Sequence, residues 1–427
     1  MSTLKVNKLR DTAGSTDAIT LDPNGGAVLA GVTTVTSVKV GAAVTISESG
    51  IDASGIGITC ANINGTQIGG RRNLIHNGAM TVAQRGTSST DSGYYTLDRF
   101  ASYWSGTDES PTQAQVDVAS GTTPYTNGFR KSYKVTNGNQ TSGAGTSDWV
   151  WFRYLFEAQD IANSGWNYTS SSSYVTLSFW IKSSVAQTFK GYLRSRDGTE
   201  QRYAFETGSL TADTWTKIVK TIPGNSNLQF DNDANQGLQL NILGFMGTDY
   251  TDSSVTEDVW AAYASGTRMK DNTSTWYTTN DATLELTGVQ LEVGSQATAF
   301  EHRSFGEELS LCQRYFYMHA SGAEAASNGG ETPIGLGYGY TSTDCYLVVK
   351  FPVTMRSNPS MYKVVGSNYF RFAYNGNNAY PDNVGNNRVA TQSAEIYFYS
   401  NASWSQNDGG MVRINNTAAR LGFDAEL

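Results

Sequence analysis

The residues of this chain best suited to chemistry are aromatic side chains set among polar neighbours. Trp404 lies within Ser403–Asn407, a stretch of serine, glutamine and asparagine. An indole ring can stack on the apolar C–H face of a sugar, while nearby amides and hydroxyls bond the sugar's hydroxyl groups. Because nothing in this local sequence favours burial, we expect Trp404 to face solvent and to bind such a ligand.

Four tyrosines in the same part of the chain share this setting. Tyr338 and Tyr340 flank a glycine in a Gly-rich stretch, and Tyr374 and Tyr380 bracket an Asn-rich loop. Loops carried on a rigid scaffold are a usual place for recognition. We therefore predict that these tyrosines and Trp404 together form a ligand-binding surface.

A second set of aromatic and basic residues lies earlier, on runs that alternate between apolar and polar positions. Trp180 lies on the polar side of one run, and Trp151, Tyr192 and Arg194 hold similar positions in neighbouring runs. Flat rings with nearby charged donors suit a sugar, so one hypothesis is a platform that includes Trp151, Trp180 and Tyr192. For any single one of these rings we favour the alternative that it belongs to the core of a second sheet, because large aromatic side chains are mostly buried.

Motifs for catalysis are not found in the sequence. It has no nucleophile elbow, metalloprotease helix, phosphate-binding loop or dinucleotide fingerprint. His76, His302 and His319 lack metal-ligand spacing, which predicts structural hydrogen-bonding groups. We therefore expect a protein that is not an enzyme and needs no cofactor or transition metal. A carboxylate pair for glycoside cleavage stays open, because such pairs are defined by spatial rather than sequential spacing.

One loop, Asp231–Gly237, places oxygen ligands at alternating positions, as a calcium loop does. It lacks the terminal bidentate glutamate and its glycine is displaced by one position, so an Asx-rich turn explains it as well. Cys60, Cys312 and Cys345 are odd in number and widely spaced, without a metal-binding pattern. They predict buried or free thiols.

The composition of the 427 residues favours an all-β protein. Charged residues make up 16% and aromatic residues 12%, and there are 44 glycines, whereas helical bundles need many more Glu, Lys, Leu and Ala. The net charge of -8 provides no basic field for nucleic acid or an anionic membrane. No apolar run approaches the ~20 residues of a membrane-spanning helix. We expect neither a nucleic-acid partner nor membrane insertion.

The N-terminal part differs from the rest, because residues 1–93 contain no Phe, Trp or Tyr. Such a segment cannot easily bury enough area for a core of its own. Residues 38–46 nevertheless alternate with period two, which predicts a strand with one buried face, and Ile56, Ile58 and Cys60 repeat the pattern. Thin strands gain a core when several chains wrap around one axis, so we predict an intertwined β-structured stalk. A disordered Gly/Ser/Thr linker is the alternative.

The remaining sequence predicts a β-sandwich, a short connector helix and a small C-terminal β domain. In the sandwich the apolar phase shifts at Gly288, which predicts a β-bulge. Ser304 can cap a helix that begins at Phe305. In the C-terminal part, alternate residues are predicted to point inward: Cys345, Leu347, Val349, Phe351 and Val353 in one run, Phe370 and Phe372 in a second, and Ile396 and Phe398 in a third. The strand-like runs of the sandwich are 149–156, 175–182, 188–194, 214–222, 237–245 and 283–293.

Several of these stretches, in order along the chain, resemble a module common in phage tail fibres. The matching stretches are Asn73–Met80, Gln84–Gly86, Tyr95–Phe100, Leu177–Ser183 (LSFWIKS) and Leu286–Phe316. The resemblance covers residues 73–317 and implies a receptor-binding protein with a jelly-roll domain similar to carbohydrate-binding modules. Such proteins are usually homotrimers whose β-structured N-terminal stalk docks to the tail. The part beyond Met318 shares only the general look of variable tip domains.

We therefore expect a virion tail fibre that adheres to a bacterial surface glycan without cleaving it. Its parts would be a tail-attachment segment (1–30), a trimeric stalk (31–72), the jelly roll (73–303) and the distal tip (304–427). Its partners would be two further copies of the chain, tail or baseplate proteins at the N-terminus and the host polysaccharide. The alternatives are a tailspike-like depolymerase, which would normally need a longer repetitive β-helix, and a purely structural spacer.

Overall fold

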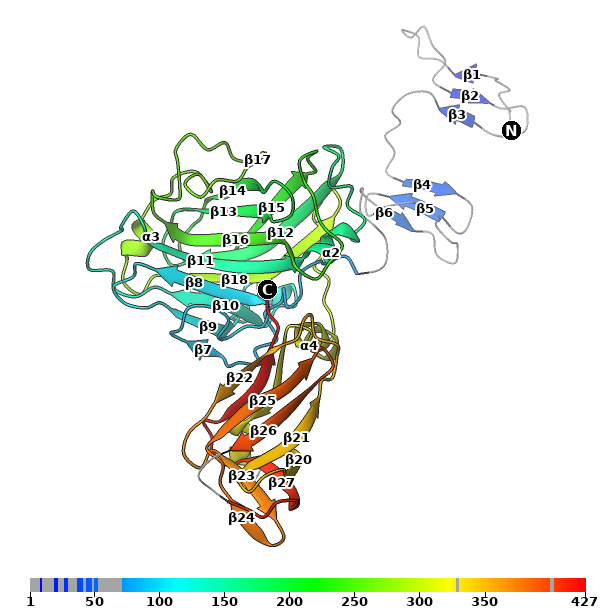
Figure 1. Ribbon diagram of the computed structural model, residues 1–427. Helices are drawn as coiled ribbons and strands as arrows, with labels where there is room; N and C mark the ends of the chain where they lie inside the picture. Colours follow the sequence, from blue (N-terminus) through cyan, green and yellow to red (C-terminus); the bar gives the residue numbers. More distant parts are fainter. Residues whose placement is uncertain are drawn as a thin grey trace. The chain divides into compact units, whose positions relative to one another are not determined.

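The computed structural model describes residues 71–427 except 328–329 and 400–402, and within residues 1–70 it describes six short strands without their side chains. The chain divides into two compact units, Met1–Ala61 and Asn62–Leu427, and each is described by itself. The described parts are almost entirely antiparallel β-structure, which confirms the all-β prediction (Figure 1). In these parts no helix combines the length and apolar character needed to cross a membrane.

The first unit contains two three-stranded antiparallel sheets. Their strands are β1 (Lys8–Leu9), β2 (Ile19–Leu21) and β3 (Ala27–Leu29) in one, and β4 (Ser37–Val40), β5 (Val44–Ser47) and β6 (Gly50–Asp52) in the other. The alternating run 38–46 is therefore not one strand, because β4 and β5 pair with each other, with Val40 opposite Val44. Ile56, Ile58 and Cys60 lie outside the described residues, as does most of the predicted attachment segment and stalk.

The second unit begins with a sandwich of two six-stranded sheets. The β12 sheet contains, in spatial order, β15 (Thr216–Pro223), β12 (Tyr174–Ser183), β18 (Thr283–Val293), β10 (Lys131–Thr136), β9 (Thr112–Asp117) and β7 (Ser88–Ser89). The β16 sheet contains β17 (Trp260–Ala262), β14 (Gln201–Ser209), β13 (Thr188–Ser195), β16 (Gln236–Met246), β11 (Trp149–Glu157) and β8 (Phe100–Ser105).

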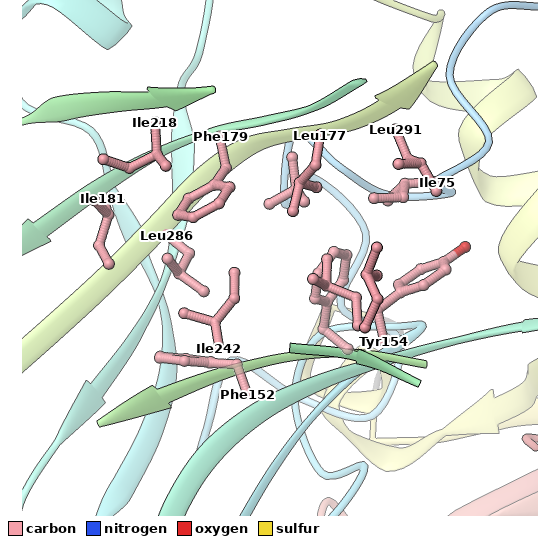
Figure 2. Packing of buried hydrophobic residues seen from close by; sticks show 14 of the residues in the cluster. Ile75, Phe152, Tyr154, Leu177, Phe179, Ile181, Ile218, Ile242, Leu286 and Leu291 are labelled. Carbon is pink, nitrogen blue, oxygen red and sulfur yellow. The ribbon is translucent and has the colours of Figure 1, made fainter. Parts of the chain in front are cut away.

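The core of the sandwich forms where the inward side chains of the two sheets interdigitate. Leu177, Phe179 and Leu286 of the β12 sheet face Phe152 and Ile242 of the β16 sheet (Figure 2). All five are at most 3% exposed. Burial of each such side chain contributes roughly 1.5–3 kcal/mol to the free energy of folding. Because successive side chains of a strand point to opposite faces, the period-two alternation determines which face is buried.

The predicted bulge is confirmed at Gly288. Ser178 lies opposite Gln290 and Trp180 opposite Thr287, so Phe179 alone faces two residues of β18. Gly288 has a φ of 61°, in the left-handed region that a glycine adopts without steric cost. The bulge shifts the side-chain phase of β18 and keeps both halves of the strand facing the core.

The predicted connector helix is also confirmed as α4 (Phe305–Gln313), where the Ser304 side chain accepts a hydrogen bond from the Glu307 amide. Sequence reasoning missed three helices of one turn or little more, because they are too short for a periodic pattern. They are α1 (Thr123–Thr126), α2 (Ala158–Ala162) and α3 (Thr275–Thr278).

The C-terminal domain packs a three-stranded sheet against a seven-stranded sheet. The smaller contains β19 (Phe316–Ser321), β28 (Arg420–Asp424) and β22 (Ser360–Val364), and a 3-10 helix, η1 (Gly322–Ser327), follows β19. The larger, the β21 sheet, contains β24 (Asn377–Ala379), β23 (Phe370–Tyr374), β27 (Gly409–Ile414), β20 (Thr332–Gly339), β21 (Asp344–Lys350), β26 (Ser393–Tyr399) and β25 (Asn383–Ala390).

Buried charges join the C-terminal domain to the sandwich. Arg85 and Arg99 of the sandwich are buried, and both form ion pairs with Glu426. Arg85 also pairs with Asp424, with its Nη2 2.9 Å from Asp424 Oδ2. Both oxygens of Glu157 accept hydrogen bonds from Arg314, at 2.7 Å each. Removing one partner of such a pair leaves an uncompensated buried charge, so these contacts hold the two domains together.

Candidate functional site

Five tyrosines lie side by side on the solvent-facing side of the β21 sheet, and we call this surface the tyrosine face. They come from β20, β21 and β26 and the turn after β20. Alternation places them there, because Cys345, Leu347 and Val349 point into the core and their neighbours point out. The five are Tyr338, Tyr340, Tyr346, Tyr397 and Tyr399.

The rings of the tyrosine face are in contact with one another. Tyr346 lies at the centre, with ring centroids 5.0 Å from Tyr340, 6.5 Å from Tyr338 and 5.4 Å from Tyr397. The Tyr346 and Tyr397 rings are stacked at an interplanar angle of 20°, and Tyr399 follows Tyr397 at 5.3 Å. These are the spacings of interacting aromatic rings, so the face is a continuous aromatic surface.

Register between strands produces this row. Tyr338 is paired with Tyr346 across β20 and β21, and Tyr346 is paired with Tyr397 across β21 and β26. The neighbouring strand β25 places Gly385 opposite Tyr397. A Cβ at residue 385 would lie 2.7 Å from Cζ of Tyr397, so the glycine leaves the room that this ring occupies.

The tyrosine face is open to solvent. Tyr338 and Tyr340 are 49% and 55% exposed, and the adjacent Leu336 and Val348 are 77% and 59% exposed. Large apolar side chains exposed next to each other on a folded domain mark a surface that meets another molecule. The phenol groups add hydrogen-bonding capacity along the same surface.

Polar groups border the rings. Glu395 of β26 accepts hydrogen bonds from Asn387 and from Arg388, whose Nη1 lies 3.0 Å away. Partial burial and the nearby Asp344 carboxylate raise the pKa of Tyr346, so its hydroxyl stays protonated at neutral pH. A ring surface with phenol donors and a charged border can stack on C–H faces while it bonds hydroxyl groups, which is the chemistry of a sugar-binding surface.

Sequence reasoning identified Tyr338 and Tyr340 but missed Tyr346, Tyr397 and Tyr399. The signal was present, since each of the three alternates with residues already assigned to the core. The other two predicted tyrosines are apart from the face. Tyr374 stacks on the buried Phe372, with centroids 5.0 Å apart, and Tyr380, on the far side of the Asn-rich loop, is 38% exposed.

The expectation that Trp404 faces solvent is wrong. Trp404 is 5% exposed and belongs to the core of the C-terminal domain, with its ring 5.4 Å from that of Phe372. Its segment folds back on the sheet, because the Trp404 amide donates to the Ser342 carbonyl and the Asn407 amide to Gly339. The indole occupies space that a side chain at Gly339 would fill, so the reason for burial is distant in sequence.

The predicted platform of Trp151, Trp180 and Tyr192 does not exist as one surface. Trp151 and Tyr192 lie on the outer face of the β16 sheet, whereas Trp180 lies on the outer face of the β12 sheet, on the other side of the sandwich. The sequence could not reveal this, because alternation gives the face of each strand but not the sheet to which the strand belongs.

The outer face of the β16 sheet is covered. Trp151 and Tyr192 are 5% and 1% exposed, beneath Val255 and Met269 of the segment between β16 and α3. Arg194 is also engaged, with its Cζ 3.5 Å from the centre of the Tyr263 ring and its Nε 3.0 Å from Glu200 Oε2. The alternative that these rings are buried therefore holds for Trp151 and Tyr192.

Among the residues that the structure describes, four buried polar atoms of this covered layer have no protein hydrogen-bond partner. They are Trp151 Nε1, Arg202 Nη1, Gln239 Oε1 and Asn241 Nδ2. Buried polar atoms are nearly always hydrogen-bonded, to ordered water where no protein group is available. The layer is thus polar and aromatic but closed.

The remaining candidate residues from the sequence are the histidines, the loop 231–237 and the cysteines. His302 and His319 each place Nε2 2.9 Å from a backbone carbonyl, as structural histidines do. In the loop 231–237, Asp233 Oδ1 accepts a hydrogen bond from the Asn235 amide, the geometry of an Asx turn. The described residues include no group of three or more His, Cys, Asp or Glu placed to hold a metal ion. Cys312 and Cys345 are buried free thiols, and Cys60 lies outside the described residues.

Comparison with known proteins finds no family model that matches the chain and no matching curated protein. Solved structures that resemble it include the enzymatically active domain of tailspike protein 4 from bacteriophage CBA120, at 9% identity and a TM-score of 0.27, covering 52% of this chain and 21% of that one. They also include the N-terminal cellulose-binding domain of Cellulomonas fimi β-1,4-glucanase C, at 12% identity and a TM-score of 0.25, covering 51% of this chain and 99% of that one.

A third is the CBM22-1–CBM22-2 tandem domain of Paenibacillus barcinonensis Xyn10C, at 10% identity and a TM-score of 0.24, covering 86% of this chain and 100% of that one. At TM-scores of this size the likenesses carry no argument about function. The β-sandwich described above rests on the chain's own sheets and core.

Proposed function

We propose that this protein is a tail fibre of a virion and that it binds a glycan on the surface of a host bacterium without cleaving it. The tyrosine face supports the glycan-binding part, because it presents a row of touching rings to solvent with phenol and charged groups beside them. It is the observation that carries the proposal. The covered Trp151 and Tyr192 make the outer β16 face the less suitable surface.

The tail-fibre part of the proposal rests on the sequence resemblance of residues 73–317. It implies a homotrimer that docks to the tail through its N-terminal part, with the C-terminal domain distal. The tyrosine face belongs to that C-terminal domain, which is the part of a fibre that meets the host first. Location in the virion tail follows from the same proposal.

Two measurements on the full chain test it. The protein is incubated with envelope polysaccharide purified from a candidate host, and both bound polysaccharide and new reducing ends are quantified. Saturable binding without new reducing ends is expected. Binding with release of oligosaccharides would indicate a depolymerase, and no binding to the polysaccharide of a host that the virion infects would indicate a spacer.

The trimer is tested separately by light scattering. The expected mass is about three times the 46.2 kDa of one chain. A monomer at micromolar concentration would contradict the proposed assembly, whatever the result with polysaccharide.

A further inference from the structure

A cavity of about 170 Å³ lies on the outer face of the β12 sheet, on the side of the sandwich away from the covered Trp151 layer. β12 and β15 form its floor, and the turn after α1 and the segment that follows β18 form its walls. The side chains that matter for its chemistry are Phe129, Ser178, Trp180, Lys217, Phe300 and His302.

Three rings form one wall of this cavity. The Phe129 and Phe300 centroids are 4.9 Å apart, and the His302 ring lies 5.2 Å from Phe129 and 4.9 Å from Phe300. His302 is held in place by the contact of its Nε2 with the Asn127 carbonyl oxygen at 2.9 Å. The rings come from parts of the chain about 170 residues apart, so the cavity is a product of the tertiary fold rather than of one loop.

The bulge at Gly288 makes room for this arrangement. A Cβ at residue 288 would lie 2.6 Å from Cζ of Phe129, so a larger residue there would displace the ring. The indole of Trp180 adds a further aromatic surface from the strand that pairs with β18.

The charge of the cavity is positive. None of its lining residues is Asp or Glu. Lys217, which lies directly across from Trp180 in the sheet, is exposed and has no ion-pair partner among the described residues. The nearby lysines differ, because Lys182 pairs with Glu285 at 2.9 Å and Lys220 with Asp258 at 3.4 Å. An unpaired ammonium beside a set of rings favours a ligand that combines a C–H face with an anionic group.

We propose that this cavity binds a single acidic sugar unit, a pyranose that carries a carboxylate. Its volume is close to the ~150 Å³ of an apolar cavity that admits benzene, so it has room for one six-membered ring, while the open side leaves the substituents of the ring and the rest of a polysaccharide in solvent. The ring packs against Trp180 and Phe300, and the carboxylate pairs with Nζ of Lys217. This inference rests on the proposed glycan binding and deepens it, because it selects polysaccharides that contain uronic acid units.

Saturation-transfer NMR on the full chain tests the inference, with sodium glucuronate as the probe and glucose as the neutral comparison. Glucuronate should show saturation transfer to its ring protons, and glucose should bind more weakly. Lys217→Gln should weaken glucuronate binding about fivefold, the value of one partly exposed ion pair. Lys270→Gln is the matched control and should change nothing, because Lys270 is exposed and follows Met269 of the covered layer on the other side of the sandwich.

Trp180→Ala should abolish the glucuronate signal, and Lys217→Gln serves alone if that variant fails to fold. Equal binding of glucose and glucuronate, an unchanged signal in Lys217→Gln, or no signal from the parent would each overturn the inference. The proposed function is judged separately with host polysaccharide. Polysaccharide binding without a glucuronate signal contradicts only the acidic-sugar cavity, and a glucuronate signal without polysaccharide binding contradicts only the proposed function.

Discussion

Replacing Trp404 with alanine should destabilise the C-terminal domain, because the ring is core rather than a ligand-binding group. Truncating a buried Trp to Ala removes the transfer free energy of the ring and leaves a cavity, at a typical cost of about 3–5 kcal/mol. Trp404 is 5% exposed and packs edge-on against Phe372 at 77°, over the backbone of Gly339. With these contacts, we expect the loss of the ring to lower the free energy of unfolding by this typical amount.

The buried N–H group of the Trp404 ring lowers the expected loss of stability. Trp404 Nε1 is buried and has no hydrogen-bond partner within the described part of the chain. An unsatisfied buried donor costs the folded state about 1–3 kcal/mol, and the substitution removes this cost. With central values of about 4 kcal/mol for the lost ring and about 2 kcal/mol for the removed penalty, we expect Trp404→Ala to lower the free energy of unfolding by about 2 kcal/mol.

The assay is urea unfolding of the full chain, with the transition of the C-terminal domain followed by the reactivity of Cys345, a thiol buried in the core of that domain. Tyr340→Ala is the matched control, since Tyr340 is 55% exposed and surface substitutions usually change stability by about 0.5 kcal/mol or less. A Trp404→Ala variant whose stability falls within about 0.5 kcal/mol of the parent protein would refute the assignment of this ring to the core.

Three further predictions concern other parts of the fold. Burial and the Glu157 carboxylate raise the pKa of Asp160 to about 6, so Asp160 should cost the folded state stability as pH rises from about 4 to 6. Because burial also raises the pKa of Asp98 to about 6, Asp160→Asn should reduce this loss in thermal scans but not remove it. Gly288→Ala should lower the melting temperature, because alanine at a φ of 61° is strained; an unchanged value would contradict the bulge geometry. Cys312 and Cys345 should react with a thiol reagent only after unfolding, since burial raises the pKa of both thiols; rapid reaction of either in the native protein would contradict their burial.

Period-two alternation predicted much of the architecture from sequence. It identified β11, β12, β13, β15, β16 and β18 and the inward side chains of β21, because a strand with one buried face repeats its apolar residues at every second position. The phase shift at Gly288 also predicted the bulge. The same logic, applied to the outward positions of β21 and β26, would have found the rest of the tyrosine face.

What alternation cannot give is which strands become neighbours. Trp151 and Trp180 both lie on outward positions, but the strand order places them in different sheets. Trp404 has only polar residues beside it in sequence, and its burial depends on a glycine 65 positions earlier. The Phe129–Phe300 cavity likewise depends on tertiary contacts between distant segments. Each of these features is set by long-range packing, which local residue patterns do not encode.

The measurement that tests the central claim most directly is the affinity of a Tyr338→Ala/Tyr346→Ala variant for host polysaccharide. Each ring contributes about 0.5–1.5 kcal/mol of stacking, so the loss of two rings should weaken binding by roughly 5- to 150-fold relative to the parent, with the melting temperature little changed. A variant that folds normally and binds the polysaccharide with the affinity of the parent would show that the tyrosine face is not the surface that binds the glycan.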